Sequence, residues 1–176
     1  NFHQCPTVAY SGELDAQKQA ADIMSKYLSK EGIVLKHILG AGMGHQYDDA
    51  SKADIERWLV PILATGRDRS PSSIRFTTYT LRYNRMRWVQ VDGLERHWER
   101  GRVDAKISGS TIYATTCGVT ALNLSFGAEE SPFQPGQAVR VVIDGDELDC
   151  GTVGKDRSWL LQLVKRHEGW STGSTL

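Results

Sequence analysis

The chain has 176 residues, of which 40% are hydrophobic and 24% charged, enough for one ordinary globular core or two small ones. This composition excludes a disordered, fibrous or membrane-spanning chain. The 21 Lys and Arg residues balance 21 Asp and Glu residues, so no overall field draws the protein to nucleic acid or to an anionic membrane. We therefore predict neither nucleic acid nor a membrane as a partner.

The cysteines and the first residues say little about the cellular compartment. Cys5, Cys117 and Cys150 are too few and too scattered for a disulfide framework, and they form no Cys-x-x-Cys pair. The sequence starts at Asn1 without the features of a signal peptide. We interpret this start as a cut inside a longer protein and leave the localisation open, with a preference for a secreted or periplasmic protein.

A breaker-rich stretch at residues 66–73 divides the chain into two predicted domains, residues 1–66 and 67–176. The first has a β-α-β-α pattern, with strands at residues 7–11 and 33–39. A helical stripe over residues 16–28 stops near Gly32. Ser51, with Asp54 three residues later, is expected to start the second helix, and Pro61 is expected to kink or split it.

After the boundary the hydrophobic period falls to two, which is typical of an antiparallel β-sandwich or a small barrel. Asp92-Gly93 is a strong hairpin signal, and turns are also expected at residues 108–110 and at Asp144-Gly145. Strands are predicted at residues 74–80, 86–91, 103–107, 111–115, 119–124, 139–143 and 160–164. The predicted fold class is α+β, a short β-α-β-α segment followed by a β-sandwich.

Two ionisable residues, Asp15 and His45, each follow a predicted strand of the first domain. A strand-helix-strand crossover makes the two strands parallel, so both loops emerge at the same carboxyl edge of the sheet. A carboxylate and an imidazole that meet there can form the acid and base of a nucleophilic triad. The order acid then histidine is also the order at the end of the α/β-hydrolase fold.

The segment Tyr10–Asp15, the helix that follows it and Gly44-His45-Gln46-Tyr47 resemble the end of the catalytic domain of prolyl-oligopeptidase-like α/β hydrolases. The resemblance covers residues 7–63 and implies that Asp15 is the triad acid and His45 the triad base. It also implies that the nucleophile elbow, the oxyanion-hole loop and most of the sheet would precede Asn1. The β-domain after the hydrolase segment departs from the family's usual propeller partner.

No serine of the sequence is a good candidate for the missing nucleophile. Residues 169–173 read Gly-Trp-Ser-Thr-Gly, but a nucleophile elbow needs a strand before it, a helix after it and a place before the acid and the base. Ser11 stands near Asp15 but on the wrong side of the sheet edge. The chain alone is therefore expected to be inactive.

Plainer roles remain open for the same residues. Asp15 could cap the helix that it precedes, and His45 could be a loop residue bonded to the glycine-rich turn. A metal site among His37, His45, Asp48 and Asp49 is disfavoured, because His37 lies within a strand and no pair has helical i,i+4 spacing. The acidic pair Asp48-Asp49 is more simply expected to begin the second helix, where its charge suits the helix dipole. We predict no metal and no cofactor.

Nine arginines from Arg67 to Arg102, with aromatic residues among them, could form a surface that binds single-stranded nucleic acid or another anionic ligand. Arginines that alternate with apolar residues more often form the solvated face of a sheet, so we disfavour this alternative. Trp88 and Trp98 could line a sugar-binding groove, although a core tryptophan is the commoner outcome.

The leading hypothesis is the C-terminal portion of a serine hydrolase, a peptidase or esterase that lacks its serine nucleophile. Its partners would be a peptide or ester substrate, the missing N-terminal catalytic segment and, through an exposed sheet edge, a second copy of the chain. The alternative hypothesis is a non-enzymatic β-sandwich module that binds a glycan or a protein. It predicts that Asp15 and His45 do not meet.

Overall fold

The computed structural model describes residues 1–173, and the chain divides into two compact units. The first unit is Phe2–Arg67, and the second is Asp68–Leu176 together with Asn1. Over the described residues the protein is mixed α+β, with two α-helices and a majority of strands in several sheets. Within the same residues, neither helix is long and apolar enough to cross a membrane.

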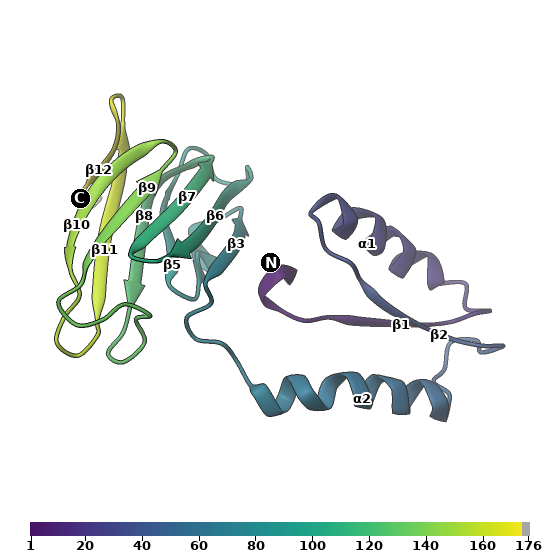
Figure 1. Ribbon diagram of the computed structural model, residues 1–176. Coiled ribbons are helices and arrows are strands. Elements are labelled where there is room, and N and C mark those ends of the chain that lie inside the picture. Colours follow the sequence, from purple (N-terminus) through teal and green to yellow (C-terminus); the bar gives the residue numbers. More distant parts are fainter. Residues whose placement is uncertain (174–176) are drawn as a thin grey trace. The chain divides into compact units, whose positions relative to one another are not determined.

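The first unit is built around two parallel strands. After a 3-10 turn, Phe2–Gln4, come β1 (Val8–Gly12), α1 (Lys18–Lys30), β2 (Lys36–Gly40) and α2 (Asp49–Thr65). β1 pairs with β2 from Val8 opposite Lys36 to Gly12 opposite Gly40, and α1 and α2 lie on opposite sides of the pair (Figure 1). Because the strands are parallel and in register, both end at the same edge of the sheet.

Helix α1 ends where the glycine predicted it. Gly32 has a φ of 74°, a conformation in which glycine meets no steric penalty, and its N–H donates to the Ser29 carbonyl. The N–H of Ile33 reaches back to the Leu28 carbonyl at 3.0 Å. These two bonds satisfy carbonyls at the end of the helix and turn the chain toward β2.

Helix α2 begins at the acidic pair Asp48-Asp49, as expected from its charge, and not at Ser51. Its N-cap is Asp48, whose Oδ1 accepts the Ser51 N–H at 2.8 Å, and the Ser51 hydroxyl donates to Asp48 Oδ2. The expected start at Ser51 is wrong because the carboxylate three residues earlier already captures its amide. Pro61 does not split the helix either. The carbonyl of Arg57, which loses its intrahelical partner at Pro61, lies on an exposed stretch where water can bond to it.

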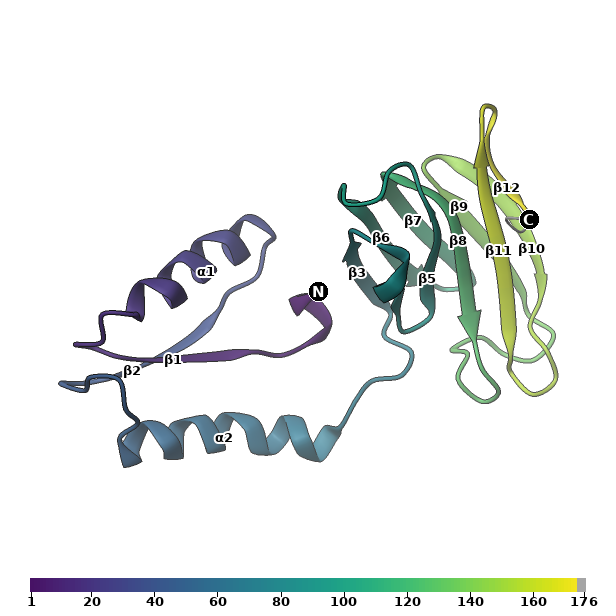
Figure 2. The same ribbon diagram turned by 180° about the vertical axis from the view of Figure 1, so that it is seen from behind.

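The second unit contains two five-stranded sheets (Figure 2). The first has the order β10-β9-β7-β6-β3 and the second the order β12-β11-β8-β5-β4. The strands are β3 (Ser73–Thr78), β4 (Arg85–Met86), β5 (Val89–Leu94), β6 (Gly101–Ser108), β7 (Thr111–Cys117), β8 (Val119–Phe126), β9 (Ala138–Ile143), β10 (Asp146–Thr152), β11 (Trp159–Arg166) and β12 (Gly169–Thr172). A 3-10 turn, Leu81–Tyr83, lies between β3 and β4.

Side chains from both sheets form one hydrophobic core. Phe126 lies at its aromatic centre, with ring centroids 5.4 Å from Trp88, 6.0 Å from Phe133 and 6.3 Å from Trp159. The buried Trp88 donates from Nε1 to the Pro71 carbonyl at 2.8 Å, which satisfies the polar atom of its ring. Trp88 is therefore a core residue and does not line a sugar-binding groove.

The sheets depart from the expected pattern at several places. The single strand predicted at residues 86–91 is wrong, because β4 and β5 are separate strands there. The hairpin predicted at Asp92-Gly93 is wrong, because Gly93 lies inside β5 where the register with β8 shifts. A Cβ on Gly93 would come within 2.4 Å of Thr120 Oγ1, so glycine there serves a bulge. The pairing is also not wholly antiparallel, since β7 and β9 run parallel. The turns at Gly109 and at Asp144-Gly145 are confirmed.

Candidate functional site

The loops that follow β1 and β2 interlock at the carboxyl edge of the two-stranded sheet. The N–H of Glu13 donates to the Gly40 carbonyl, and the N–H of Leu14 donates to the Met43 carbonyl, both at 2.9 Å. The backbones approach so closely that a Cβ on Gly12 would lie 2.0 Å from the Gly44 carbonyl oxygen. The glycine at the end of β1 therefore permits the contact that fixes one loop against the other.

This contact brings together the two residues that the sequence singled out. His45 Nδ1 lies 2.8 Å from Asp15 Oδ2, across 30 residues of sequence. With the proton on Nδ1, the imidazole donates to the carboxylate and its Nε2 is left as an acceptor. The side chain of His45 is 77% exposed, whereas that of Asp15 is 12% exposed. The acid is thus enclosed by the loops, and the imidazole is presented to solvent.

Asp15 also bonds to the backbone of the turn that leads into α1. Its Oδ1 accepts the N–H of Gln17 at 2.8 Å, so its two oxygens serve different partners. The Gln17 amide and, after it, the His45 ring hold the pKa of Asp15 below its ordinary value. The expected helix-capping role of Asp15 is wrong, because the N-cap of α1 is Gln17 and, among residues 1–173, no side chain caps the helix. The carboxylate instead joins the turn before α1 to His45.

Sequence reasoning missed two residues that support the histidine loop. Glu13 Oε2 accepts the N–H of Gly42 at 2.8 Å, and the Tyr10 hydroxyl donates to the Gln46 carbonyl at 2.7 Å. The Tyr10 ring also stacks on Tyr47, with centroids 4.3 Å apart. Glu13 carried the same signal as Asp15, a carboxylate directly after a strand. The sequence contained no sign of the Tyr10 contact, because its partner Gln46 lies 36 residues away.

A second histidine, His37, belongs to a separate contact. Its Nε2 lies 3.0 Å from the Oγ of the buried Ser11, inside the two-stranded sheet. Ser11 is therefore bonded to a histidine other than His45. His37, His45 and the Asp48-Asp49 pair do not assemble into a site, and residues 1–173 contain no group of three or more His, Cys, Asp or Glu residues that could hold a metal.

The acyl-accepting hydroxyl that a triad needs is not beside His45. Over residues 1–173, Asp15 is the one side chain hydrogen-bonded to the His45 ring. Ser171, in the Gly-x-Ser-x-Gly string, lies in strand β12 of the other unit, and its hydroxyl donates to the Val164 carbonyl. It occupies no strand-to-helix turn, which is what a nucleophile elbow requires.

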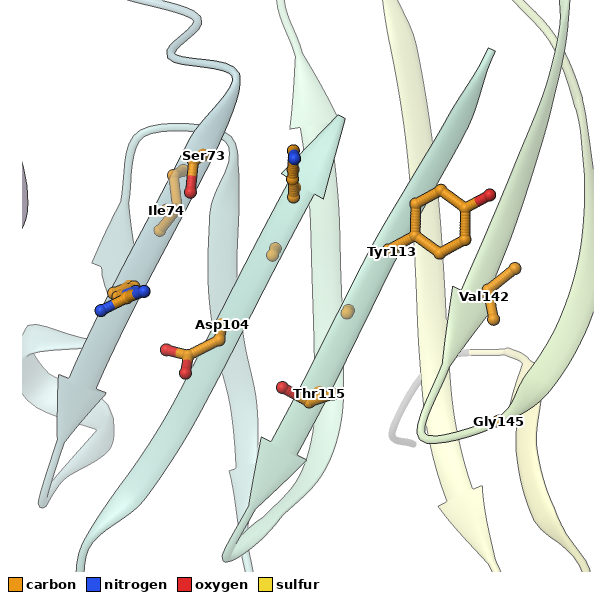
Figure 3. Close-up of a pocket in the computed structure, with 11 residues that line it drawn as sticks. Ser73, Ile74, Asp104, Tyr113, Thr115, Val142 and Gly145 are labelled. Atoms are coloured by element: carbon orange, nitrogen blue, oxygen red, sulfur yellow. The ribbon is translucent and has the colours of Figure 1, made fainter. Parts of the chain in front are cut away.

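The second unit has its own candidate site on the outer face of the β10-β9-β7-β6-β3 sheet. A hollow of about 380 Å³ lies there, lined by side chains of β3, β6, β7 and β9 (Figure 3). Part of the predicted arginine band borders it, and those arginines are not a uniform positive surface. Arg102 pairs with Asp104 at 3.0 Å, and Arg96 pairs with Glu99 at 3.4 Å.

Comparison of the chain with protein-family models, with curated proteins and with solved structures finds no match.

Proposed function

We propose that residues 7–63 form the C-terminal end of the catalytic sheet of a prolyl-oligopeptidase-like serine hydrolase, a peptidase or an esterase. The observation that carries this proposal is the 2.8 Å contact between His45 Nδ1 and Asp15 Oδ2 at the carboxyl edge of a parallel strand pair. Open α/β sheets place their sites at that edge. The serine would come from a polypeptide segment outside these 176 residues.

In this mechanism His45 transfers the proton, and Asp15 orients the His45 ring. His45 Nε2 accepts the proton of the serine hydroxyl while the serine oxygen attacks the acyl carbonyl. The carboxylate of Asp15 holds the ring in the tautomer that leaves Nε2 free and stabilises the imidazolium that forms. His45 then gives the proton to the departing amine or alkoxide, and a water molecule repeats the cycle to release the acid.

The surface of the first unit supports its membership in a larger sheet. A parallel sheet is normally covered on both faces and continued by neighbouring strands. Here several large apolar side chains are exposed in a unit of two strands, among them Val34, which is 96% exposed, Leu14, Leu39 and Leu63. Additional strands and helices of a hydrolase domain would remove such surface from water.

In the same proposal the two five-stranded sheets form a β-sandwich that is accessory to the catalytic domain. Their shared core and the short strands joined by turns support this description. No constellation of nucleophile, base and acid is apparent among the described residues of this unit. Its contribution would be to bind substrate or to cover the rim of the active site.

The proposal is tested by supplying the missing segment. The segment encoded upstream of Asn1 in the same transcript is expressed with the 176-residue chain, and hydrolysis of aminoacyl and short acyl-ester chromogenic substrates is measured. We expect turnover that falls about 10⁴-fold with Asp15→Asn and about 10⁶-fold with His45→Ala. His37→Ala is the matched control, because this second histidine is bonded to Ser11 and should leave turnover within a few-fold of the parent.

Two results would contradict the proposal. One is an upstream segment that lacks a strand, a Gly-x-Ser-x-Gly turn and a helix in that order. The other is serine-dependent turnover by the 176-residue chain alone, since it would place the nucleophile inside this chain.

A further inference from the structure

The outer face of the β10-β9-β7-β6-β3 sheet carries an ordered array of polar and aromatic side chains. Along β3, Ile74 and Phe76 are buried, and Arg75 between them is exposed. The register places Arg75 opposite Asp104 on β6, and Asp104 opposite Thr115 on β7. One step along the strands, Lys106 lies opposite Tyr113. These cross-strand neighbours share one face and lie within reach of a common ligand.

The hollow lies between these side chains. Ala105 and Ala114 also line the hollow, but both are buried and belong to the alternate residues of β6 and β7 that pack in the core, so neither places a side chain on the outer face. Asp104, Thr115 and Tyr113, from two adjacent strands, border the hollow in Figure 3. Its volume of about 380 Å³ is in the range of small-molecule sites.

An exposed aromatic residue lies on this face, and two more follow it in space near the end of β3. Tyr113, which is 49% exposed, lies at one end. At the other end, where Thr78 pairs with Gly101, the Trp98 N–H donates to the Tyr79 carbonyl at 2.8 Å. Tyr79 is 50% and Trp98 79% exposed. The two ends are about five residues apart along β3, or about 17 Å at roughly 3.3 Å per residue.

Trp98 is held in an unusual backbone conformation. Its φ is 67°, a region that bulky residues rarely adopt and that costs free energy. The same residue exposes most of a large apolar ring to water, which also costs free energy. Contact of the ring with a ligand would remove part of this apolar surface from water.

The charged side chains on this face favour a ligand that carries a carboxylate. Asp104 is paired with Arg102, but Lys106 makes no ion pair among residues 1–173, so its ammonium is available to a carboxylate. Thr115 and Asp104 can bond to hydroxyl groups. The faces of Tyr113 and Trp98 can pack against the C–H groups of a pyranose ring. A carboxylate, hydroxyls and flat apolar ring faces occur together in a uronic-acid-containing oligosaccharide.

We propose that this face, defined by Arg75, Asp104, Lys106, Tyr113, Tyr79 and Trp98, binds an acidic oligosaccharide along the direction of β3 and β6. The site goes beyond the hydrolase proposal and does not depend on it, because it uses no residue of the first unit. A single-stranded nucleic acid fits less well. It requires a continuous positive track, and here a carboxylate lies in the middle of the face while Glu99 pairs with Arg96 beside Trp98.

The test is titration calorimetry on the whole 176-residue chain with four probes. These are tetragalacturonate, a hyaluronan tetrasaccharide, the uncharged galactose tetrasaccharide and a single-stranded 12-mer of DNA. We expect at least one acidic tetrasaccharide to bind at least tenfold more tightly than both the neutral sugar and the DNA. Tyr113→Ala, Trp98→Ala and Lys106→Met are each expected to weaken that binding at least tenfold.

Matched controls separate this site from nonspecific adhesion. Tyr27→Ala removes an exposed aromatic ring from the first unit, and Lys155→Met removes an exposed ammonium from a distant loop, so both should leave affinity unchanged. Absence of binding to either acidic sugar would overturn the proposal. So would equal binding of the neutral sugar, tighter binding of DNA, or affinity that the three face variants leave intact. Each outcome is independent of hydrolase activity, which none of these probes measures.

Discussion

The contact between Asp15 and His45 depends on a residue that has no side chain. Gly12 ends β1 at the point where the histidine loop crosses it, and a Cβ there would lie 2.0 Å from the Gly44 oxygen and 2.4 Å from the Met43 oxygen. Both are backbone atoms, so no side-chain rotation could relieve the overlap. Because the bond between the two loops passes through Met43, a displaced loop would carry His45 away from the carboxylate.

Gly12→Ala is therefore expected to break the Asp15–His45 hydrogen bond. The measurement is the proton resonance of His45 Nδ1–H, which lies far downfield while it is hydrogen-bonded to a carboxylate and should disappear in the variant. Gly44→Ala is the matched control, because a Cβ at that position meets nothing within 4 Å. A downfield resonance that survives in Gly12→Ala would show that the glycine is not needed for the contact.

Asp144 plays a comparable part in the second unit, where it joins the two sheets. Its Oδ1 accepts the Thr116 N–H from β7, and its Oδ2 accepts the Trp170 indole N–H from β12 and the Lys165 ammonium from β11. Burial raises the pKa of Asp144, but hydrogen bonds from Thr116, Trp170 and Lys165 outweigh it and hold the pKa below its ordinary value. The ionised carboxylate is therefore the form that stabilises the fold.

Asp144→Asn should lower the free energy of unfolding by about 1–3 kcal/mol at pH 7, because one amide oxygen cannot replace two charged acceptors. Asparagine tolerates the φ of 50° at this position, so the backbone is not the cause. Since the folded pKa lies below the unfolded value of about 3.9, the contribution is complete above that value and is lost as the pH falls through the folded pKa.

Denaturant unfolding of parent and variant at a series of pH values measures this difference. The difference in the free energy of unfolding between parent and variant should be largest at pH 7 and should approach zero toward pH 2. Asp149→Asn, an exposed aspartate on β10, is the control and should leave stability nearly unchanged at both ends of the series. A difference of constant size from pH 7 to pH 2 would contradict the role assigned to the Asp144 charge.

At the scale of elements, the hydrophobic periodicity of the sequence located most strands and both helices. It did not predict which strands pair with one another. β10 and β12 were missed because each has few apolar residues: β10 alternates only through Leu148 and Cys150, and β12 has Trp170 alone. β10 forms because the Asp144-Gly145 turn returns the chain along β9. β12 pairs with β11, and the Trp170 N–H donates to Asp146 at its start. Both strands depend on partners that a local window cannot reveal.

The same limit explains which parts of the candidate site could be predicted. Asp15 and His45 could be placed at one edge because a parallel crossover fixes the edge from which both loops leave. Two starts were predicted for α2, and Asp48 prevails over Ser51 because it bonds to both the amide and the hydroxyl of Ser51. The contacts of Glu13 and Tyr10 arise from loop geometry, which sequence spacing does not determine.

At the scale of the whole molecule, the two units differ sharply in what they bury. The buried hydrophobic side chains of the first unit are Leu28 and Leu35, whereas the second unit contains the large core shared by its two sheets. Burial of apolar surface stabilises a fold by about 25 cal/mol per Å², so the second unit should have most of the stability. A unit of this size without a sufficient core is marginal on its own.

We therefore expect residues 68–176 expressed alone to unfold in one cooperative transition, with a midpoint within a few degrees of that of the same unit in the whole chain. Residues 2–67 expressed alone should show little protection of backbone amides from hydrogen exchange, because few apolar side chains leave water when they fold. Exchange measured on the whole chain should show the same contrast between the units. If residues 2–67 were strongly protected in isolation, their exposed apolar side chains would need no further strands to cover them, and the larger hydrolase sheet proposed for them would lose its physical support.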